Sequence, residues 1–130
     1  MGVAFYRGAD CCLLVYDMTL PSSFRNLNEW HDEFLLQASP HDPETFPIAI
    51  VGNKMDLAKE RAITARKALK WCQEKNNLSH FEVSSLHGIN VELVFEALAR
   101  RALARGKDMD EIVGQVVFGQ EKTKKTGCGC

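Results

Sequence analysis

Short apolar runs alternate along the chain with longer stretches in which apolar residues recur every three or four positions. The short runs are too compact for free helices and predict strands that are buried on both faces. They lie at residues 11–16, 46–52 and 80–84. The longer stretches predict amphipathic helices at residues 22–38, 64–76 and 90–105. Strand and helix alternate, which predicts an α/β fold with parallel strands joined by right-handed crossovers.

Each predicted helix has one apolar face that we expect to pack against the sheet. The first and third helices are expected to begin with polar caps, a Ser following Pro21 and Asn90 respectively. The face of the first helix carries Phe24, Leu27, Trp30, Phe34 and Ala38. That of the second carries Ala65, Ala68, Leu69 and Cys72, and that of the third carries Val91, Val94, Phe95, Leu98 and Leu103. From Gly106 the pattern fades, which predicts an ordered body at residues 1–105 and a mobile tail at residues 106–130.

Two polar loops are expected to lie side by side at one edge of the predicted sheet. The central strand ends in the loop Asn53–Asp56, and the last strand ends in the loop Ser84–Leu86. The carboxyl ends of parallel strands share one rim of a sheet, and ligands bind at that rim in open α/β folds. The sequence therefore predicts one binding site that is built from both loops.

The chemical groups in these loops suit guanine better than adenine. The carboxylate of Asp56 can accept two adjacent N–H donors, which guanine offers at N1 and N2 and adenine does not. The amide of Asn53 can tie the loop together or reach a purine N7, and the stem of Lys54 can cover a ring face. A free backbone N–H of the second loop can donate to guanine O6, where adenine carries an amino group. The two loops would thus reject adenine for different reasons.

Composition and charge narrow the range of functions. The chain has 130 residues, of which 45% are hydrophobic and 25% charged, as expected for one globular domain. The formal net charge of −1 gives no reason to expect a nucleic-acid partner, and no apolar run approaches the ~20 residues of a membrane span. No secretory signal is visible. We expect a cytosolic monomer in which Cys11, Cys12 and Cys72 are reduced core residues.

Several segments resemble the Rab branch of the Ras-like small GTPases. The sequence Asn53-Lys54-Met55-Asp56 is similar to the NKxD guanine-specificity motif, although by itself it is equally typical of a polar turn after a strand. Ser84-Ser85-Leu86 stands where the family has its SAK motif, and residues 5–10 resemble the end of switch II. A more specific resemblance, to the late-endosomal and lysosomal Rabs, lies at residues 32–47, 71–72 and 89–92.

This resemblance implies a fold, a ligand and a set of partners. The fold would be the C-terminal part of a Ras-like P-loop G domain, with about three parallel strands, flanking helices and a flexible tail. The ligand would be GTP or GDP, with Mg²⁺ as the cofactor of the family. The guanine-binding residues would be Asn53, Lys54, Asp56, Ser84, Ser85 and Leu86. The role would be GTP-switched vesicle trafficking on late endosomes and lysosomes, with a cytosolic pool and with Rab effectors and the Rab escort and prenylation machinery as partners.

Two features of the chain bear on how well these functions would be carried out. Leu86 replaces the Lys of the SAK motif, which implies weaker guanine binding with unaltered specificity. The terminal Cys128-Gly129-Cys130 resembles the double geranylgeranylation signal of Rabs, and two prenyl chains give stable membrane anchoring. Nearby lysines would add roughly 1 kcal/mol each at an anionic membrane surface. The alternative for the two thiols is an exposed dithiol that binds metal weakly or oxidises.

The elements that grip phosphate and Mg²⁺ in this family are not found in the sequence. We find no Gly-rich phosphate loop followed by Lys and Ser/Thr, no switch I Thr and no Asp-x-x-Gly followed by Gln. Gly114 and Gly119 have the spacing of a phosphate loop, but Gln120 and Glu121 follow them. The expectation is a chain with no catalytic residue and no metal ligand, which begins just after the point where switch II would supply Gln. Binding through the base alone predicts a dissociation constant near millimolar, about −4 kcal/mol, and no detectable hydrolysis.

Two other interpretations stay open at this point. In the family, a further strand flanks the run at residues 11–16, and without it that run would form an open edge that favours aggregation. The chain would then be a truncated gene product that does not fold stably. It would otherwise be a non-catalytic, prenylated interaction module that binds its partners without any nucleotide.

Overall fold

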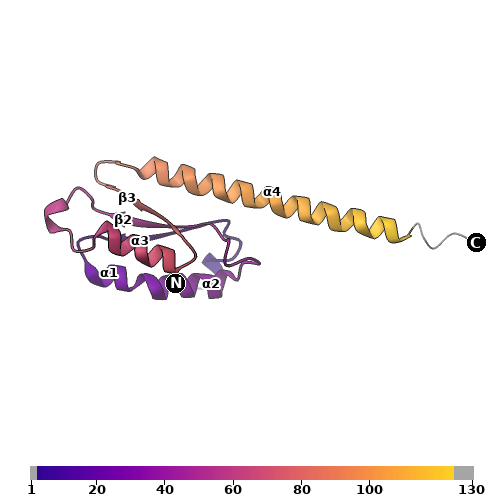
Figure 1. The fold of residues 1–130 in the computed structure, drawn as a ribbon, viewed down its shortest axis with the longest axis horizontal. Helices are drawn as coiled ribbons and strands as arrows, with labels where there is room; N and C mark the ends of the chain where they lie inside the picture. Colours follow the sequence, from indigo (N-terminus) through magenta and orange to yellow (C-terminus); the bar gives the residue numbers. More distant parts are fainter. Residues whose placement is uncertain (1–2, 125–130) are drawn as a thin grey trace, which may run out of the picture.

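The structure is a three-stranded parallel sheet with helices on both faces (Figure 1). The computed structural model describes residues 3–124, with side chains described as far as Asp108. Its elements in chain order are η1 (Val3–Phe5), β1 (Cys12–Asp17), α1 (Pro21–Arg25), α2 (Leu27–Ala38), β2 (Ile48–Asn53), η2 (Ala58–Glu60), α3 (Ala65–Glu74), β3 (Ser79–Glu82) and α4 (Val91–Lys124). The strand order is β1-β2-β3 with both pairings parallel, which confirms the predicted fold class.

The central strand β2 organises the packing of both faces. Its residues Ile48, Ala49 and Ile50 are each no more than 1% exposed, because helices cover the sheet on both sides. The larger apolar cluster joins β1 and β2 to α1, α2 and α3, and the smaller one joins β2 to α4 through Val51 and Val94. This burial on both faces explains why the strand reads as one continuous apolar run instead of an alternating one.

The predicted first helix is interrupted once and begins without the predicted Ser cap. Asn26 separates α1 from α2 but keeps helical backbone angles (φ −68°, ψ −13°), so the two segments follow nearly one path. The N-cap residue is Leu20, which makes no side-chain cap, and Pro21 stands at the first helical position. Proline suits that position because its missing N–H has no helical partner there. The Ser23 hydroxyl instead bonds to the backbone of Asp17 and Leu20.

Several residues that were expected on the inner helix faces are exposed. Trp30 is 50% exposed and Phe95 is 58% exposed. Both lie beside β1, which is an edge strand in the described part of the chain, so no strand described there covers them. Leu69 and Leu103 are also exposed. Phe24, Leu27, Phe34, Ala68, Cys72, Val94 and Leu98 are buried as predicted.

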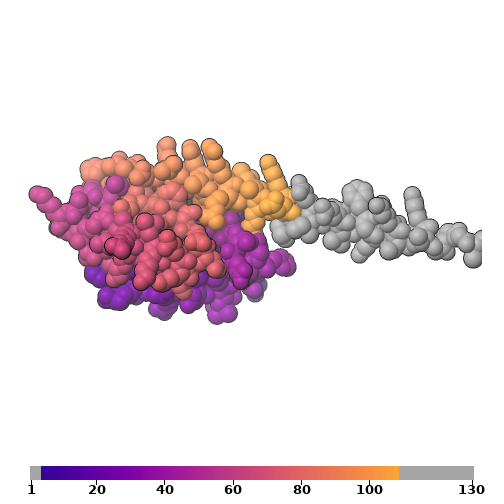
Figure 2. All heavy atoms as spheres, viewed as in Figure 1, coloured from indigo at the N-terminus to yellow at the C-terminus, as the bar shows by residue number. Residues whose placement is uncertain are grey.

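Helix α4 is longer than the sequence pattern indicated. It runs from Val91 to Lys124, whereas the apolar periodicity predicted an end near residue 105. Residues 107–124 contain no proline, and an isolated glycine costs a helix only about 1 kcal/mol. The helix can therefore continue through this segment although its apolar periodicity is weak. Figure 2 shows the first turns of α4 lying over the body of the fold. The division of the chain into a body and a tail stays a prediction.

Asn90 precedes α4 but does not cap it through its side chain as predicted. Its side-chain amide donates to the carbonyl of Glu82 (2.9 Å), and its backbone is left-handed (φ 62°). Asparagine tolerates that conformation, so Asn90 ties the end of β3 to the turn before the helix. None of the helices in the described part of the chain is long and apolar enough to cross a membrane.

An ion pair fastens α4 to the loop before β2, and it predicts a pH dependence. Arg105 Nε donates to Asp42 Oδ1 (3.1 Å), and the guanidinium lies 4.9 Å from the ring centre of Phe46. Hydrogen bonds from Arg105 and Thr45 lower the pKa of Asp42 from 3.8 to about 2. Above the ordinary Asp pKa of 3.8, the ion pair contributes its full stabilisation to the fold. This stabilisation is lost as the pH falls through the lowered pKa of Asp42, about 2.

We expect Asp42→Asn to be less stable than the wild type at pH 5 to 7, by less than about 1 kcal/mol because Asp42 is partly exposed. The difference should shrink as the pH falls from 4 toward 2 in urea unfolding followed by circular dichroism. Asp10→Asn changes an exposed carboxylate that forms no ion pair within the described residues, and it serves as the control. A difference that does not change with pH would contradict this role for the ion pair.

Candidate functional site

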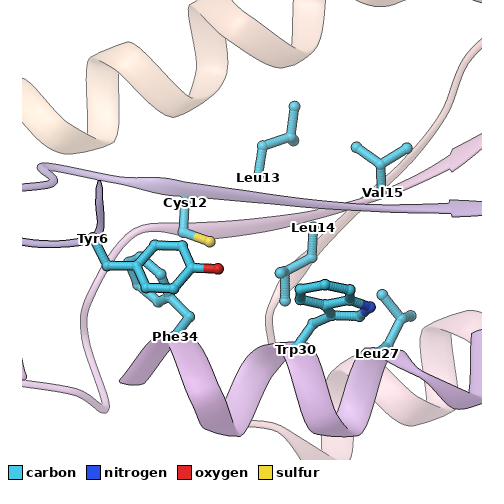
Figure 3. A pocket seen from close by; sticks show the side chains of 8 residues that line it. All are labelled: Tyr6, Cys12, Leu13, Leu14, Val15, Leu27, Trp30 and Phe34. Atoms are coloured by element: carbon cyan, nitrogen blue, oxygen red, sulfur yellow. The ribbon is translucent and has the colours of Figure 1, made fainter. Parts of the chain in front are cut away.

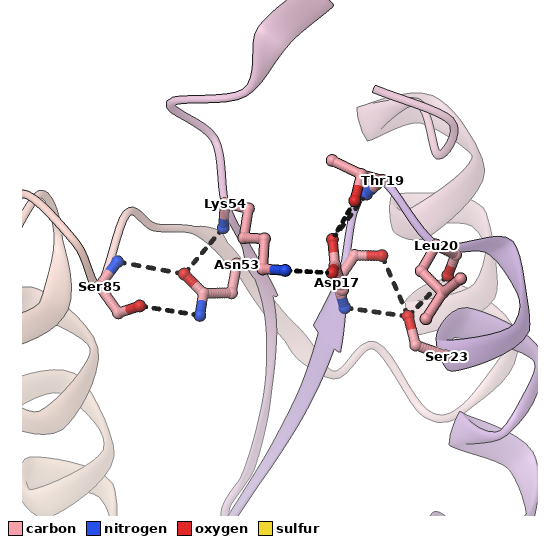
Figure 4. Close-up of polar contacts among 7 residues, drawn as sticks. All are labelled: Asp17, Thr19, Leu20, Ser23, Asn53, Lys54 and Ser85. Atoms are coloured by element: carbon pink, nitrogen blue, oxygen red, sulfur yellow. Dashed lines mark hydrogen bonds and ion pairs between the residues drawn. The ribbon is translucent and has the colours of Figure 1, made fainter. Parts of the chain in front are cut away.

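The carboxyl ends of the three strands meet at one rim, where the polar residues gather (Figure 4). Asp17 at the end of β1 is the register partner of Asn53 at the end of β2, and Gly52 is the partner of Glu82 on β3. Backbone hydrogen bonds join β2 and its loop to the end of β3, because Val83 N–H donates to Gly52 (2.8 Å) and Met55 N–H donates to Val83 (3.0 Å). The two predicted loops are therefore neighbours, as the parallel topology required.

Asn53 ties the two loops to each other. Its Oδ1 accepts from the backbone N–H of Ser85 (3.1 Å) and from that of Lys54 (2.7 Å), and its Nδ2 donates to Ser85 Oγ (3.0 Å). The orientation of the amide is fixed by chemistry, because a backbone N–H can only donate and must face the oxygen. Of the two roles that were predicted for Asn53, the structure shows the tie within its own loop, through the Lys54 N–H, and it adds a tie to the second loop through Ser85. The Ser85 hydroxyl adds a bond that the alanine of a SAK motif would not make.

Lys54 reaches across the rim to β1. Its Nζ lies 2.8 Å from Asp17 Oδ2, and its backbone is left-handed (φ 69°). Partial burial alone would raise the pKa of Asp17, but hydrogen bonds from Lys54 and Thr19 outweigh it and lower that pKa. The hydrogen bond and charge of Asp17 raise the pKa of Lys54 in turn. Both groups stay charged at neutral pH, so the ion pair holds the lysine stem along the rim between the strands.

Asp56 is held from the second loop by a buried hydroxyl. Ser84 Oγ donates to Asp56 Oδ1 (2.8 Å), and Ser84 is fully buried. The same hydroxyl accepts the backbone N–H of His87 (3.3 Å), so it is satisfied in both directions. Among the described residues, Asp56 Oδ2 has no hydrogen-bond partner, which leaves a carboxylate oxygen available at the rim.

The second loop is a tight turn that closes on itself. Ser84 and Ile89 exchange two backbone hydrogen bonds (3.1 and 3.0 Å). Gly88 has a positive φ of 67°, which the turn needs and which glycine adopts without strain. Leu86 stands at its tip with a side chain that is 77% exposed. The N–H groups of Ser85 and His87 are both bonded within the loops, and in the described part of the chain that of Leu86 is not.

Tyr16 and Gly52 set the spacing beneath the rim. The Tyr16 hydroxyl lies 2.9 Å from His80 Nε2 on β3, across the central strand. It passes over Gly52, where a Cβ atom would come within 2.7 Å of the hydroxyl oxygen. Glycine is therefore required at the residue before Asn53, because any side chain there would displace Tyr16.

The neutral form of His80 is favoured in the fold, which predicts a loss of stability in mild acid. Burial lowers the pKa of His80, and the charge of Arg61 lowers it further while Glu82 opposes the shift. Below the ordinary pKa of 6.5 the unfolded chain therefore binds a proton that the folded chain does not, and stability falls as the pH falls from about 7. We expect the free energy of unfolding to fall more steeply between pH 7 and 5.5 in the wild type than in His80→Gln. The exposed His41→Gln should keep the wild-type slope, and equal slopes in all three chains would contradict the prediction.

Two residues of the site were missed by the sequence reasoning. Asp17 was not predicted to belong to the site, and Tyr16 was predicted only as part of the apolar run at residues 11–16. The available signal was the register of parallel strands, since a polar residue ending β1 falls beside the residue that ends β2. Cys128 and Cys130, the predicted lipidation sites, lie outside the described residues.

Comparison with known proteins assigns the fold to a family. A family model described as the Ras family matches residues 1–104 of the chain. The chain belongs to the Ras family. The polar rim is formed by Asn53–Asp56 and Ser84–Leu86, which are the segments that resemble the NKxD and SAK motifs of the family.

The relatives of this Ras-family chain belong to the Rab7-like branch, which confirms the predicted branch. The Ras-related protein Rab7 of Drosophila melanogaster is 48% identical over 127 residues, which cover 95% of this chain and 61% of that protein. The Ras-related protein RABG3c of Arabidopsis thaliana and the Ypt/Rab-type GTPase avaA of Emericella nidulans are each 46% identical over 134 residues. Those matches cover 100% of this chain and 65% of each relative. The chain thus spans less than two thirds of the length of these relatives.

Proposed function

We propose that the rim at the ends of β2 and β3 binds the base of a guanine nucleotide. The Asp56 carboxylate would accept from guanine N1–H and N2–H side by side, and the Leu86 N–H would donate to O6. The observation that carries this proposal is the Ser84–Asp56 hydrogen bond (2.8 Å), together with the tie between Asn53 and Ser85. These contacts hold the acceptor of one loop in a fixed place relative to the donor of the other.

The side chains of Lys54 and Leu86 would pack against the faces of the base and would not distinguish guanine from adenine. The stem of Lys54 lies along the rim because its ammonium is held by Asp17, and a flat ring can stack against it. The exposed side chain of Leu86 offers an apolar cover from the second loop, although it lacks the charge of the family's lysine. Adenine has no N–H donor to place against the Asp56 carboxylate. Its amino group would face the Leu86 N–H, so that two donors would meet. Such mismatches leave buried polar groups unpaired, which supports selection for guanine by orders of magnitude.

Binding through the base alone would be weak. We propose a dissociation constant near millimolar for this chain, about −4 kcal/mol, because phosphate and Mg²⁺ contacts supply most of the affinity in nucleotide sites. We found no sequence motif for either contact. Hydrolysis of GTP by this chain alone would then be undetectable. Guanine, and not Mg²⁺, is the group for which the described residues offer a fitting set of donors and acceptors.

A comparison of guanosine compounds tests this proposal. Guanosine, GMP, GDP and GTP should bind with affinities within about threefold of one another, and Mg²⁺ should not strengthen any of them, because all would share only the base contacts. Ligand-observed magnetic resonance titration measures these affinities in the millimolar range. Tight binding of GDP that depends on Mg²⁺ would contradict the proposal of base contacts alone.

The proposed role of the protein is that of a Rab7-type small GTPase. By its relatives, we propose GTP-switched vesicle trafficking on the cytoplasmic face of late endosomes and lysosomes, with Rab effectors and the escort and prenylation machinery as partners. Prenylation of Cys128 and Cys130 would supply the membrane anchor. The Ras family model and the Rab7-like relatives support this role.

A second function is favoured by the surface of α2. Trp30 is 50% exposed and lines an apolar hollow together with Tyr6 and Phe34 (Figure 3), and a contiguous exposed apolar patch is typical of protein contacts. The chain would then act as a prenylated interaction module without using nucleotide. Partner capture that is unchanged by GTP, GDP or chelation of Mg²⁺ would favour this function, and capture that requires GTP would exclude it.

A further inference from the structure

An ion pair between Arg61 and Glu82 makes one more connection between the two loops of the rim. Arg61 follows η2 in the segment that leaves the first loop, Asn53–Asp56, and Glu82 is the last residue of β3, directly before the second loop. Arg61 Nη2 lies 2.6 Å from Glu82 Oε2, and the two side chains are only 28% and 25% exposed. The pair therefore joins the exit of the first loop to the strand that enters the second.

The carboxylate of Glu82 depends on Arg61 for the compensation of its charge. Glu82 Oε2 is buried and accepts no hydrogen bond within the described residues. Arg61 is also the one cation in the described part of the chain that forms an ion pair with Glu82. A buried carboxylate without an opposite charge is costly, so the guanidinium is held at this position and does not move freely in solvent.

The segment that carries Arg61 is itself fixed to the end of the first strand. The backbone N–H groups of Ala62 and Ile63 both donate to the carbonyl of Met18, which directly follows β1 (2.8 and 3.0 Å). Arg61 Nη1 also donates to the carbonyl of Ile63 (3.2 Å). Arg61 thus connects a segment that is anchored at β1 with a carboxylate on β3.

Successive turns join Arg61 back to Asp56, the proposed acceptor for guanine. Leu57 N–H donates to the carbonyl of Lys54 (2.9 Å), and Glu60 N–H donates to the carbonyl of Leu57 (2.9 Å). These bonds leave little freedom between Asp56 and Arg61. A displacement of Arg61 would therefore also displace the Asp56 carboxylate.

Glu82 is connected in the same way to both ends of the second loop. It precedes Ser84 by only two residues, and Ser84 donates to Asp56 (2.8 Å). Beyond the turn, the side chain of Asn90 donates to the backbone carbonyl of Glu82 (2.9 Å). The start and the end of the second loop are therefore both fixed relative to Glu82.

We propose that Arg61 and Glu82 are positioning residues for guanine recognition. Neither residue is among the groups that contact the base. Their ion pair keeps the exit of the first loop against β3, and this holds the Asp56 carboxylate in register with the Leu86 N–H of the second loop. Binding sites reach their full affinity only when such supporting contacts fix the groups that touch the ligand. The proposal rests on the base-binding function proposed above, and it adds a contact that lies outside the two recognition motifs.

Two variants separate positioning from a contribution to stability alone. Arg61→Met removes the cation and leaves the Glu82 carboxylate buried without a partner, so this variant should be clearly less stable than the wild type. Combining Arg61→Met with Glu82→Gln removes both charges, and we expect the double variant to recover much of the lost stability. GMP should still bind about tenfold more weakly to both variants than to the wild type. A tenfold loss is expected if the unpaired loops hold the binding geometry for about a tenth of the time.

Titration of the full 130-residue chains with GMP, followed by backbone amide shifts, measures these affinities, and urea unfolding measures the stabilities. Asp42→Asn is the control, because it breaks the ion pair with Arg105 before β2, at the opposite end of that strand from the rim. It should lower stability slightly and leave the affinity for GMP unchanged. Wild-type affinity in the double variant would overturn the positioning role, and the double variant decides this even if Arg61→Met does not fold.

Hydrogen exchange gives a second readout that needs no ligand. Met55 N–H donates to the carbonyl of Val83 (3.0 Å) and so reports whether the two loops stay together. In the double variant the Met55 amide should exchange faster than in the wild type, while the amide of Ile50 in the centre of β2 stays protected. Unchanged exchange at Met55 would overturn the positioning role whether or not GMP binds. A wild type that does not bind GMP would instead refute the base-binding function, and the two failures are thereby distinguished.

Discussion

Asp56→Asn is expected to reverse the base preference of the chain from guanine to xanthine. The side chain of Asn can keep its oxygen toward the Ser84 hydroxyl, so the 2.8 Å bond that positions the residue survives. The oxygen that faces the ligand becomes an NH₂ group, which meets the guanine N–H donors with another donor. Xanthine has a carbonyl at C2 and accepts from that NH₂ group. We expect the ratio of guanine to xanthine affinity to fall by about a hundredfold, since a mismatched polar pair leaves both groups unsatisfied.

Titration with GMP and with XMP measures this ratio for both chains. The wild type should bind GMP near millimolar and XMP more weakly, whereas the variant should bind XMP and show no measurable GMP binding. Asp10→Asn makes the same chemical change far from the rim and should keep the wild-type preference. If the preference of Asp56→Asn equals that of the wild type, Asp56 does not read the base.

Gly52→Ala is expected to destabilise the fold by about 1–3 kcal/mol, the usual range for an added methyl group in a packed interior. The new Cβ would lie 2.7 Å from the Tyr16 hydroxyl oxygen and 3.2 Å from the terminal methyl of Met18. Tyr16 is 2% exposed and is also held by His80, so it cannot move aside without losing that hydrogen bond. The effect should extend to the site, because Gly52 immediately precedes Asn53.

Gly106→Ala provides a matched control for this substitution. Gly106 lies in α4, and a Cβ there would meet no atom within 4 Å, so alanine should leave stability unchanged or raise it through its better helix propensity. Chemical unfolding of both variants gives the two free energies. Equal stabilities for Gly52→Ala and the wild type would mean that Tyr16 is less constrained than its packing indicates.

The local sequence was sufficient to predict the strands, the order of elements and the neighbouring loops. Continuous apolar runs marked β1 and β2, and parallel connections required Asn53 and Ser85 to end on the same rim. The exposure of Trp30 and Phe95 was not predictable from periodicity, because it depends on how many strands the sheet has, and that is not a local property. Both residues lie on the predicted faces of their helices. They stay exposed because they lie beside the outer edge of β1, where the described sheet ends.

The polar contacts of the site could also be predicted from the sequence only in part. Residue types alone led to the prediction that Asp56 and the second loop bind the base, but they did not show which of their atoms are free of other hydrogen bonds. Asn53 already accepts the Ser85 N–H, and this leaves the Leu86 N–H as the proposed donor to guanine O6. The pairing of Lys54 with Asp17 joins residues that are far apart in sequence and depends on the register of β1 and β2. Such pairs become visible only when the strands are aligned.

The most direct test of the proposed recognition is a map of backbone amide shifts on titration with GMP and, separately, with AMP. Joint recognition by two loops predicts that GMP shifts the amides of residues 53–56 and of residues 84–87 together, with one dissociation constant. AMP should shift neither loop at the same concentrations. Equal shifts with both nucleotides, or GMP shifts confined to one loop, would contradict guanine recognition by the paired loops.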